Sequence, residues 1–168
     1  MEGYSVINFD NLKKYQDSFG YIAMLLSFPE KLTFNENVFN ESITSQHPGY
    51  QDIVNFREVM MNYTLSEAKQ IYTDTFDFSK NSPLYMTYNK FETQKERGQM
   101  LAKLKVLYEM FGLKMVDNEL SDYLPLMLEF LQTIEWYGDD RAEENIQLVI
   151  MIIAVSYTHL TLPTNREV

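Results

Sequence analysis

Hydrophobic residues recur at helical spacing along most of the chain. The first apolar stripe stops at Pro29 and comprises Leu12, Tyr15, Phe19, Ile22, Ala23 and Leu26. A weaker stripe covers residues 34–43, and the next, after a turn at His47-Pro48-Gly49, comprises Ile53, Phe56, Met60 and Tyr63. Residues three and four positions apart share one face of a helix, whereas Pro and Gly interrupt helices. The pattern therefore predicts amphipathic helices joined by short turns.

Two capping boxes mark helix starts in the middle of the chain, at Thr64-Leu-Ser-Glu67 and at Thr93-Gln-Lys-Glu96. In each box the Thr hydroxyl can accept from the Glu amide while the Glu carboxylate reaches back to the Thr amide. The second box opens the clearest helix, and Gly112 is placed to end it. Its apolar face comprises Met100, Leu101, Leu104, Leu107, Tyr108 and Phe111.

Two further helices are predicted in the last third of the chain. Pro125 suits the first turn of one of them, where a missing N–H costs little, and Ser121 or Asp122 precedes it as a possible N-cap. The other runs from Gly138-Asp-Asp toward Ala154. Because strand alternation of useful length is absent, we predict an all-α fold, a single-domain bundle of about six or seven helices around one core.

The last residues break this pattern. The segment Val155-Ser-Tyr-Thr-His-Leu-Thr-Leu-Pro-Thr-Asn-Arg-Glu-Val168 carries no helical stripe and looks like a translated sequencing-library adapter, with an ordinary Thr-rich tail as the alternative. We therefore expect an all-helical domain at 1–154 and a non-native, adapter-like tail at 155–168. On this interpretation the chain is truncated, and the native protein continues beyond Ala154.

Composition narrows the possible functions. The chain has 168 residues, of which 45% are hydrophobic and 14% aromatic, which suits one packed domain rather than disorder. Its net charge of −10 disfavours nucleic-acid binding and favours a basic peptide or protein surface as partner. The longest apolar run, Leu148 to Val155, is too short to span a bilayer, which needs about 20 residues, so we expect no direct membrane insertion. The absence of cysteine and of a secretory signal fits a cytoplasmic protein.

Residue types that carry catalysis or bind metals are scarce. The chain has no cysteine and two histidines, His47 in a turn and His159 in the suspected tail, which lack the partners of a metal site or a triad. The six glycines are scattered and form no phosphate loop. The number of Asp and Glu residues alone does not exclude an enzyme based on paired carboxylates, although abundant Asp and Glu are typical of solvated helix faces. We predict that the protein is not an enzyme and has no catalytic residues, no metal site and no stably bound cofactor.

One block combines aromatic and acidic residues, at Tyr72-Thr-Asp-Thr-Phe-Asp-Phe-Ser79, Leu84-Tyr-Met-Thr-Tyr88 and Glu119-Leu-Ser-Asp-Tyr123. Nine acidic residues and one basic residue lie between 115 and 147, whereas 90–105 is mostly basic. The acids could bind a basic segment or simply face solvent, the aromatic residues could line a groove or fill the core, and Asp122 could merely cap a helix. The groove interpretation assigns client binding to Asp74, Asp77, Tyr85, Tyr88, Glu119, Asp122 and Tyr123.

At this block the sequence closely resembles the nitrate reductase delta-subunit family, the NarJ-type molybdenum cofactor assembly chaperones, which are related to TorD- and DmsD-like chaperones. The resemblance runs from about Phe9 to Ala154. It is strongest in Tyr72-Thr-Asp-Thr-Phe-Asp-Phe, Leu84-Tyr-Met-Thr-Tyr, Arg97-Gly-x-x-Leu-x-x-Leu-Lys-x-Leu-Tyr108 and Glu119-Leu-Ser-Asp-Tyr-Leu-Pro-Leu-Met-Leu-Glu-Phe.

The resemblance implies a cytoplasmic, TorD-like helical chaperone. Its client would be the cofactor-free catalytic (alpha) subunit of respiratory nitrate reductase, including the N-terminal leader-like segment, which it would hold for molybdenum cofactor insertion and membrane assembly. Glu119, Asp122 and Tyr123 match the family's Asp-His-type motif, with Tyr123 in place of the usual His. This replacement removes a titratable group but keeps a hydrogen-bond donor. The alternative function is an acidic helical adaptor or regulatory protein that binds another basic partner.

Overall fold

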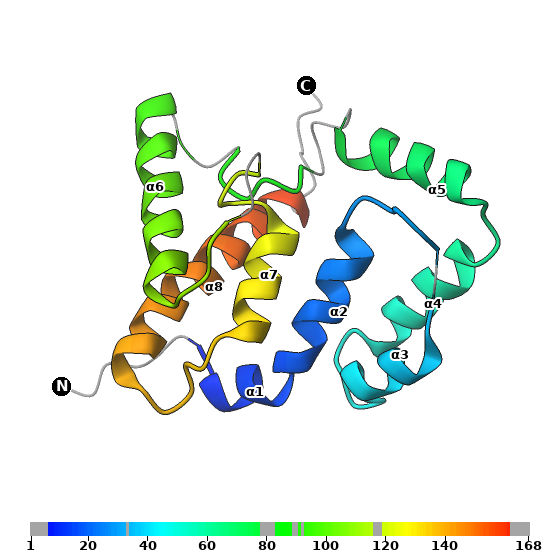
Figure 1. Ribbon diagram of the computed structural model, residues 1–168, viewed down its shortest axis with the longest axis horizontal. Helices are drawn as coiled ribbons and strands as arrows, with labels where there is room; N and C mark the ends of the chain where they lie inside the picture. The colour runs from blue at the N-terminus through cyan, green and yellow to red at the C-terminus, as the bar shows by residue number, and fades with distance from the viewer. Residues whose placement is uncertain are drawn as a thin grey trace, which may run out of the picture.

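The computed structural model of the protein describes residues 7–32, 34–77, 83–88, 91, 93–115 and 119–161, and for 157–161 it describes only the helical backbone. Within these ranges the chain is all-helical and contains no strand, which confirms the predicted fold class (Figure 1). The elements are α1 (Phe9–Lys14), α2 (Gln16–Leu26), α3 (Glu36–Ser42), α4 (Tyr50–Met60), α5 (Leu65–Tyr72), the π-helical turn η1 (Thr73–Asp77), α6 (Gln94–Met110), α7 (Leu124–Thr133) and α8 (Asp140–Thr161).

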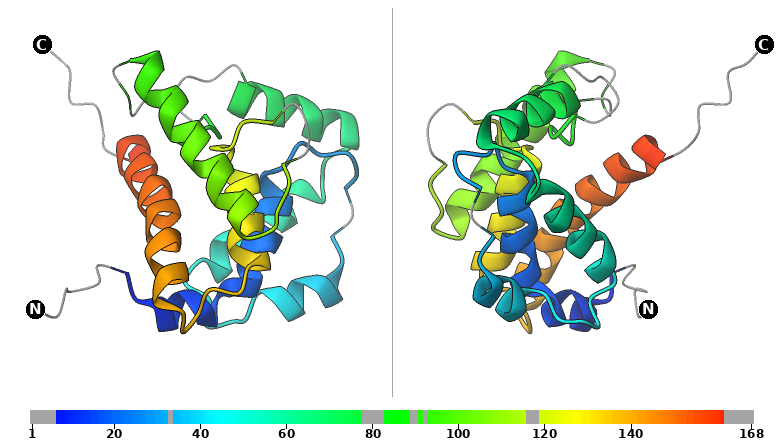
Figure 2. Two further views of the ribbon diagram at one scale, coloured as in Figure 1. Left: turned by 60° about the vertical axis from the view of Figure 1, so that its left-hand side comes forward. Right: turned by 90° about the vertical axis from the view of Figure 1, so that its right-hand side faces the viewer.

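Helices α2 and α7 lie side by side at the centre, with α3, α4 and α5 to one side and α6 and α8 to the other (Figures 1 and 2). The two central helices approach closely at Gly20, where a Cβ atom would lie 1.8 Å from the side-chain oxygen of Gln132. Gln16, at the start of α2, donates from its side-chain amide to the carbonyl oxygens of Leu131, Gln132 and Ile134, each at 3.0 Å. These bonds satisfy carbonyls at the end of α7 and fix the two helices together.

The main core lies between α6, α7 and α8. Its most buried side chains are Leu104, Met127, Leu131, Ile146 and Val149, all without measurable exposure. Tyr108 and Phe130 pack with ring centroids 4.6 Å apart. Burial of each large apolar side chain contributes about 1.5–3 kcal/mol to the free energy of unfolding, so this cluster supplies much of the stability.

A second cluster joins α2, α3 and α4 through Tyr21, Phe39, Ile43 and Ile53. Arg57 is buried beside it, with an Nη2 atom 2.5 Å from an oxygen of Glu36 and its guanidinium 4.0 Å from the Phe39 ring centroid. The hydrophobic residues therefore form two clusters among the described residues rather than the one core that the sequence predicted.

The capping signals confirm several predicted boundaries. Both capping boxes are present, with Thr64 bonded to Glu67 and Thr93 bonded to Glu96, and Gly112 has a φ of +80° just after α6. Such a positive φ favours glycine because it has no Cβ.

Other boundaries differ from the prediction. The first apolar stripe is divided at Tyr15 into α1 and α2. Helix α8 continues past Ala154 to Thr161, because no Pro or Gly interrupts its backbone ladder before Pro163. Among the described residues, no helix combines the length and hydrophobicity needed to span a membrane. Residues 162–168 lie outside the described part, so the domain limit at 154 stays a prediction.

Candidate functional site

Two segments that are far apart in the sequence meet in a short backbone bridge. Tyr85 and Tyr123 form an isolated antiparallel pair, in which Met86 N donates to Asp122 O at 2.9 Å and Leu124 N donates to Leu84 O at 2.7 Å. The bridge connects the chain before α6 to the chain before α7. It places the rings of Tyr85 and Tyr123 next to each other, with centroids 5.5 Å apart.

Asp122 is completely buried at this bridge. Its Oδ2 accepts from the backbone N of Thr87 at 3.0 Å and from the Thr87 hydroxyl at 2.5 Å, and it lies 3.6 Å from Nη2 of Arg97. Arg97 also donates from Nε to the Thr87 hydroxyl at 3.2 Å. Asp122 therefore ties residues 84–88 and α6 to the start of α7.

This position corrects two expectations for Asp122. It does not stand at an exposed rim, and it does not cap α7, whose N-cap is Tyr123 without a side-chain cap bond. The reason is the extended bridge, in which neighbouring side chains point to opposite sides, so that Asp122 turns inward. A role of Asp122 in client binding stays a prediction, and in this arrangement it would be indirect.

Three tyrosines and Glu119 form two hydrogen-bonded pairs near the surface, and the rings of Tyr85 and Tyr123 place the pairs side by side. The hydroxyls of Tyr72 and Tyr123 lie 2.9 Å apart, which connects the end of α5 to the start of α7. The Tyr85 hydroxyl donates to Oε1 of Glu119 at 3.0 Å, and the Leu120 amide donates to the same oxygen at 3.1 Å. Burial raises the pKa of Tyr72 and Tyr123, and burial together with the Glu119 carboxylate raises the pKa of Tyr85 to about 12. All three phenols therefore stay protonated at neutral pH.

The remaining predicted residues border this cluster: the Tyr88 amide donates to the Tyr85 carbonyl at 3.1 Å, and the charge of Asp77, after burial, helps to raise the pKa of Tyr72. Asp74 and Asp77 are exposed on η1, where Asp74 accepts from the Gln70 side chain at 2.9 Å. Tyr88 is 53% exposed, and the Arg97 guanidinium lies 5.7 Å from its ring centroid. The structure thus brings together Tyr85, Glu119, Asp122 and Tyr123. Phe78, Lys90 and Asp117, which belong to the sequence block or its charge pattern, lie outside the described residues.

An apolar groove of about 310 Å³ lies between the end of α2, the following loop, α4, α5 and η1. Two of its lining residues, Tyr72 and Phe76, belong to the aromatic block for which the sequence left a groove open. The contributions of α2 and α4 were missed, because Phe56 was assigned to the apolar stripe of a helix. Several of its large apolar side chains are exposed, with Met24 at 47%, Phe28 at 41% and Phe56 at 41%. Its lining includes Met24, Phe28, Phe56, Ile71, Tyr72 and Phe76.

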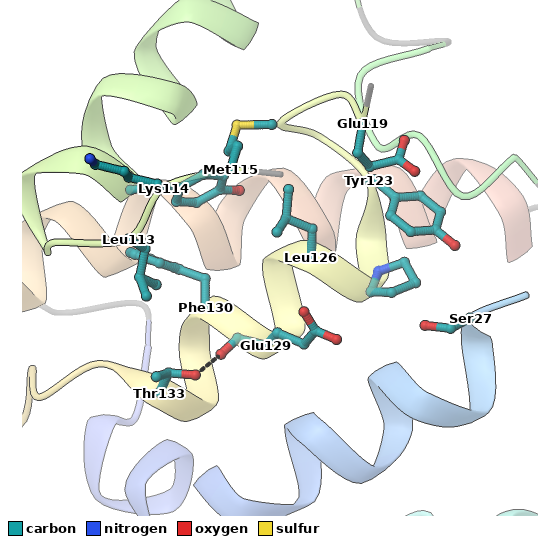
Figure 3. A pocket seen from close by; sticks show the side chains of 12 residues that line it. Ser27, Leu113, Lys114, Met115, Glu119, Tyr123, Leu126, Glu129, Phe130 and Thr133 are labelled. Atoms are coloured by element: carbon teal, nitrogen blue, oxygen red, sulfur yellow. Dashed lines mark hydrogen bonds between the residues drawn. The ribbon is translucent and has the colours of Figure 1, made fainter. Parts of the chain in front are cut away.

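A second cavity of about 330 Å³, which we call the α7 pocket, lies between α7, the end of α2 and the chain that connects α6 to α7 (Figure 3). Its lining includes Glu119, Tyr123, Pro125, Leu126, Glu129 and Phe130. Ser27 lines both cavities, and the hydroxyl pair of Tyr72 and Tyr123 joins a wall of the apolar groove to a wall of the α7 pocket. The two cavities therefore lie next to each other.

The site suits binding better than catalysis or metal coordination. Among the described residues, no group of three or more His, Asp or Glu side chains is arranged to hold a metal ion. The phenols donate to one another or to Glu119, and none of them has a lowered pKa that would make it a nucleophile at neutral pH. The arrangement offers apolar surface with carboxylates beside it.

Comparison with known proteins yields one family and several relatives. The family model described as nitrate reductase delta subunit matches residues 43–151. The chain is 34% identical over 129 residues to a Bacillus subtilis protein named "Probable nitrate reductase molybdenum cofactor assembly chaperone NarJ", a match that covers 74% of this chain and 70% of the relative.

Two Escherichia coli relatives carry similar names. The probable nitrate reductase molybdenum cofactor assembly chaperone NarW is 26% identical, over 80% of this chain and 56% of its own length. The nitrate reductase molybdenum cofactor assembly chaperone NarJ is 24% identical, over 90% of this chain and 56% of its own length. The matches therefore cover little more than half of the length of the E. coli proteins.

Proposed function

The chain belongs to the nitrate reductase delta subunit family, and from this premise we propose that it is an assembly chaperone for nitrate reductase. It binds the cofactor-free catalytic subunit, including the N-terminal leader-like segment, in the cytoplasm. It holds this client for molybdenum cofactor insertion and membrane assembly, and it binds no cofactor stably itself. The relatives are named as chaperones, which agrees with the prediction that the protein is not an enzyme.

The apolar groove is the observation that carries this proposal. Its exposed Phe28, Phe56 and Met24 would leave water when the apolar face of a client helix binds between α2, α4 and α5. Binding of an amphipathic helix in such a groove is a common mode of peptide recognition. Methionine suits a surface that adapts to its partner, because its side chain is flexible and polarizable.

The charge of the protein supports a basic client segment. The net charge is −10, and the exposed Asp74 and Asp77 stand on η1, which contributes Phe76 to the groove. Exposed charges of this kind contribute little affinity individually, but they accelerate encounter and orient the partner. A chaperone must also release its client, so we expect a dissociation constant on the order of micromolar, about −8 kcal/mol.

Calorimetric titration with a synthetic peptide tests the proposal. The peptide is the N-terminal segment of the nitrate reductase catalytic subunit from the same genome, and a scrambled peptide of equal charge is the comparison. We expect Phe56→Ser and Ile71→Ser each to weaken binding about tenfold, because each removes about 1–2 kcal/mol of apolar contact.

Met110→Ser is the matched control, because Met110 is 68% exposed and lies on α6, away from the groove. Absence of binding by a folded protein would refute the peptide-groove proposal. Equal binding of the scrambled peptide would favour the alternative, an acidic adaptor for basic partners.

A further inference from the structure

The α7 pocket combines an apolar wall with two carboxylates. The partly exposed Leu126 and the buried Pro125 and Phe130 form the apolar wall. Glu119, which is partly buried, and Glu129, which is exposed, line the same cavity (Figure 3). Arginine and lysine side chains carry a charged group on an apolar stem, so they match a cavity of this composition.

The Glu119 carboxylate is held in place by two donors. The Tyr85 hydroxyl and the Leu120 amide both donate to Oε1, at 3.0 and 3.1 Å. Both bonds end on Oε1, and among the described residues no donor bonds to Oε2 of Glu119. Tyr85 is itself fixed by its backbone pairing with Tyr123, and burial keeps its phenol protonated by raising its pKa to about 12. Tyr85 is therefore a positioning residue for Glu119, which lines the pocket.

Glu129 supplies the second carboxylate from α7. It follows Pro125 by four residues, so both side chains stand on the same face of the helix. The one described cation in the pocket lining is Lys114, which lies toward the opposite end from Tyr123 in Figure 3. Within the described ranges, neither Glu119 nor Glu129 forms an ion pair. The pocket thus holds two carboxylates that lack a neutralising partner there.

We propose that the α7 pocket is a subsite for one basic side chain of the client, whose charged end lies between Glu119 and Glu129 while its stem packs on Pro125 and Leu126. The proposal rests on the proposed function. The apolar groove adjoins the α7 pocket, so one client helix could contact both cavities. Its apolar face lies in the groove, and one of its basic residues enters the pocket beyond the Tyr72–Tyr123 pair. Charge-assisted bonds to a fixed carboxylate give such a contact both strength and register.

The test compares two versions of the client's N-terminal peptide by calorimetric titration. One is the natural peptide, and in the other each arginine is replaced by citrulline and each lysine by acetyl-lysine, which removes the charges at nearly constant shape. We expect Glu119→Gln and Glu129→Gln each to weaken binding of the natural peptide about 5- to 20-fold and to leave the neutral peptide unaffected. Glu144→Gln is the matched control, since Glu144 is exposed on α8 and does not line the pocket.

Tyr85→Phe tests the positioning role. We expect about 2- to 5-fold weaker binding of the natural peptide in the otherwise unchanged protein, and no further weakening when Glu119→Gln is already present. A merely structural role of Tyr85 would weaken binding of both peptides and would add to the effect of Glu119→Gln. Circular dichroism and thermal unfolding establish that each variant is folded.

The outcomes separate the two proposals. Equal affinity for the natural and neutral peptides, or an equal loss for both in Glu129→Gln, would overturn the basic subsite while leaving the apolar groove in place. Absence of binding by either peptide would overturn both the proposed function and the subsite. Replacement of the basic residues of the peptide one at a time then identifies the one that enters the pocket. Only when that residue is absent should Glu129→Gln leave the affinity unchanged.

Discussion

Helices α5 and α6 begin with the same capping signal but have different roles in the fold. Each opens at a Thr-x-x-Glu capping box in which both reciprocal bonds are present. Helix α6 buries Leu104, Leu107 and Tyr108 in the main core, whereas α5 buries only Ala68 among its residues. A capping box therefore determines where a helix begins, and the side chains that follow determine whether it stabilises the protein or borders a cavity.

The contacts that hold α5 in place are few and partly polar. The Tyr72 hydroxyl bonds to Tyr123, the Tyr72 ring packs edge-on against Phe28 at 5.3 Å, and Lys69 lies 3.7 Å from an oxygen of Glu30. Exposed ion pairs of this kind contribute about 0–1 kcal/mol. Local stability follows buried contacts, so α5 should open at lower free energy than α6.

Truncation of a core leucine should show this difference most strongly. We expect Leu104→Ala in α6 to lower the free energy of unfolding by about 3 kcal/mol, because it leaves a cavity at a completely buried position. Ile71→Ala in α5 is the matched variant. Because Ile71 is 36% exposed, this substitution should lower the free energy of unfolding by less than about 1 kcal/mol. Urea unfolding of both proteins measures the effects. Equal losses would contradict the assignment of α6 to the core and α5 to the binding surface.

Removal of Asp122 should have the next largest effect. Asp122→Ala leaves the Thr87 amide, the Thr87 hydroxyl and the Arg97 guanidinium without their carboxylate partner in a buried place. We expect a loss of about 2–3 kcal/mol.

Thr87→Val is the companion variant, because it removes the hydroxyl and keeps the backbone bond. Its loss in urea unfolding should be smaller, about 1 kcal/mol. If Asp122→Ala changes stability by less than Thr87→Val, the carboxylate does not hold the bridge together.

Much of the fold follows from local signals in the sequence. The two Thr-x-x-Glu boxes locate the starts of α5 and α6, and Gly112 locates the end of α6, since each acts through backbone groups within a few residues. The all-helical class follows from apolar spacing in the same way. The division at Tyr15 was not predictable, because Leu12, Tyr15 and Phe19 keep helical spacing across it. The Gln16 side chain bonds there to carbonyls more than a hundred residues away.

The candidate site could not be predicted from local signals in the same way, because it depends on contacts between segments that are far apart in the sequence. Tyr85, Glu119 and Tyr123 were selected from the sequence, but the backbone pairing that joins them spans 38 residues. That pairing also buries Asp122, which composition alone could not distinguish from an exposed acid. The contribution of Phe56 and Ile71 to the apolar groove was missed because they have the same spacing as core residues. Only the relative position of α2, α4 and α5 leaves them exposed.

The hydroxyl pair between Tyr72 and Tyr123 should affect α5 more than α6. We expect Tyr72→Phe to lower stability by about 1 kcal/mol, the usual contribution of one hydrogen bond. Hydrogen exchange should become faster for the amides of α5 and stay unchanged for those of α6. Tyr63→Phe serves as control, because Tyr63 is 40% exposed just before α5. Faster exchange throughout the protein would show that the pair supports the whole fold rather than the position of α5.

The smallest expected effect concerns the side of the molecule around α3 and α4. His47 accepts from the Gly49 amide at Nδ1, 3.0 Å away, and its Nε2 lies 3.2 Å from the Ser18 hydroxyl, so the neutral ring suits both contacts when Nε2 carries the proton. Burial lowers the pKa of His47 in the folded protein below its ordinary value of 6.5. The folded state therefore binds this proton less readily than the unfolded state, and the stabilisation is present above pH 6.5 and lost as the pH falls below it.

Because the His47 ring is partly solvated, we expect the free energy of unfolding to fall by well under 1 kcal/mol between pH 7 and pH 5. Urea unfolding at both pH values should show this loss in the natural protein and a smaller one in His47→Gln, which cannot become charged. An identical pH dependence in the two proteins would assign it to the carboxylates instead of His47.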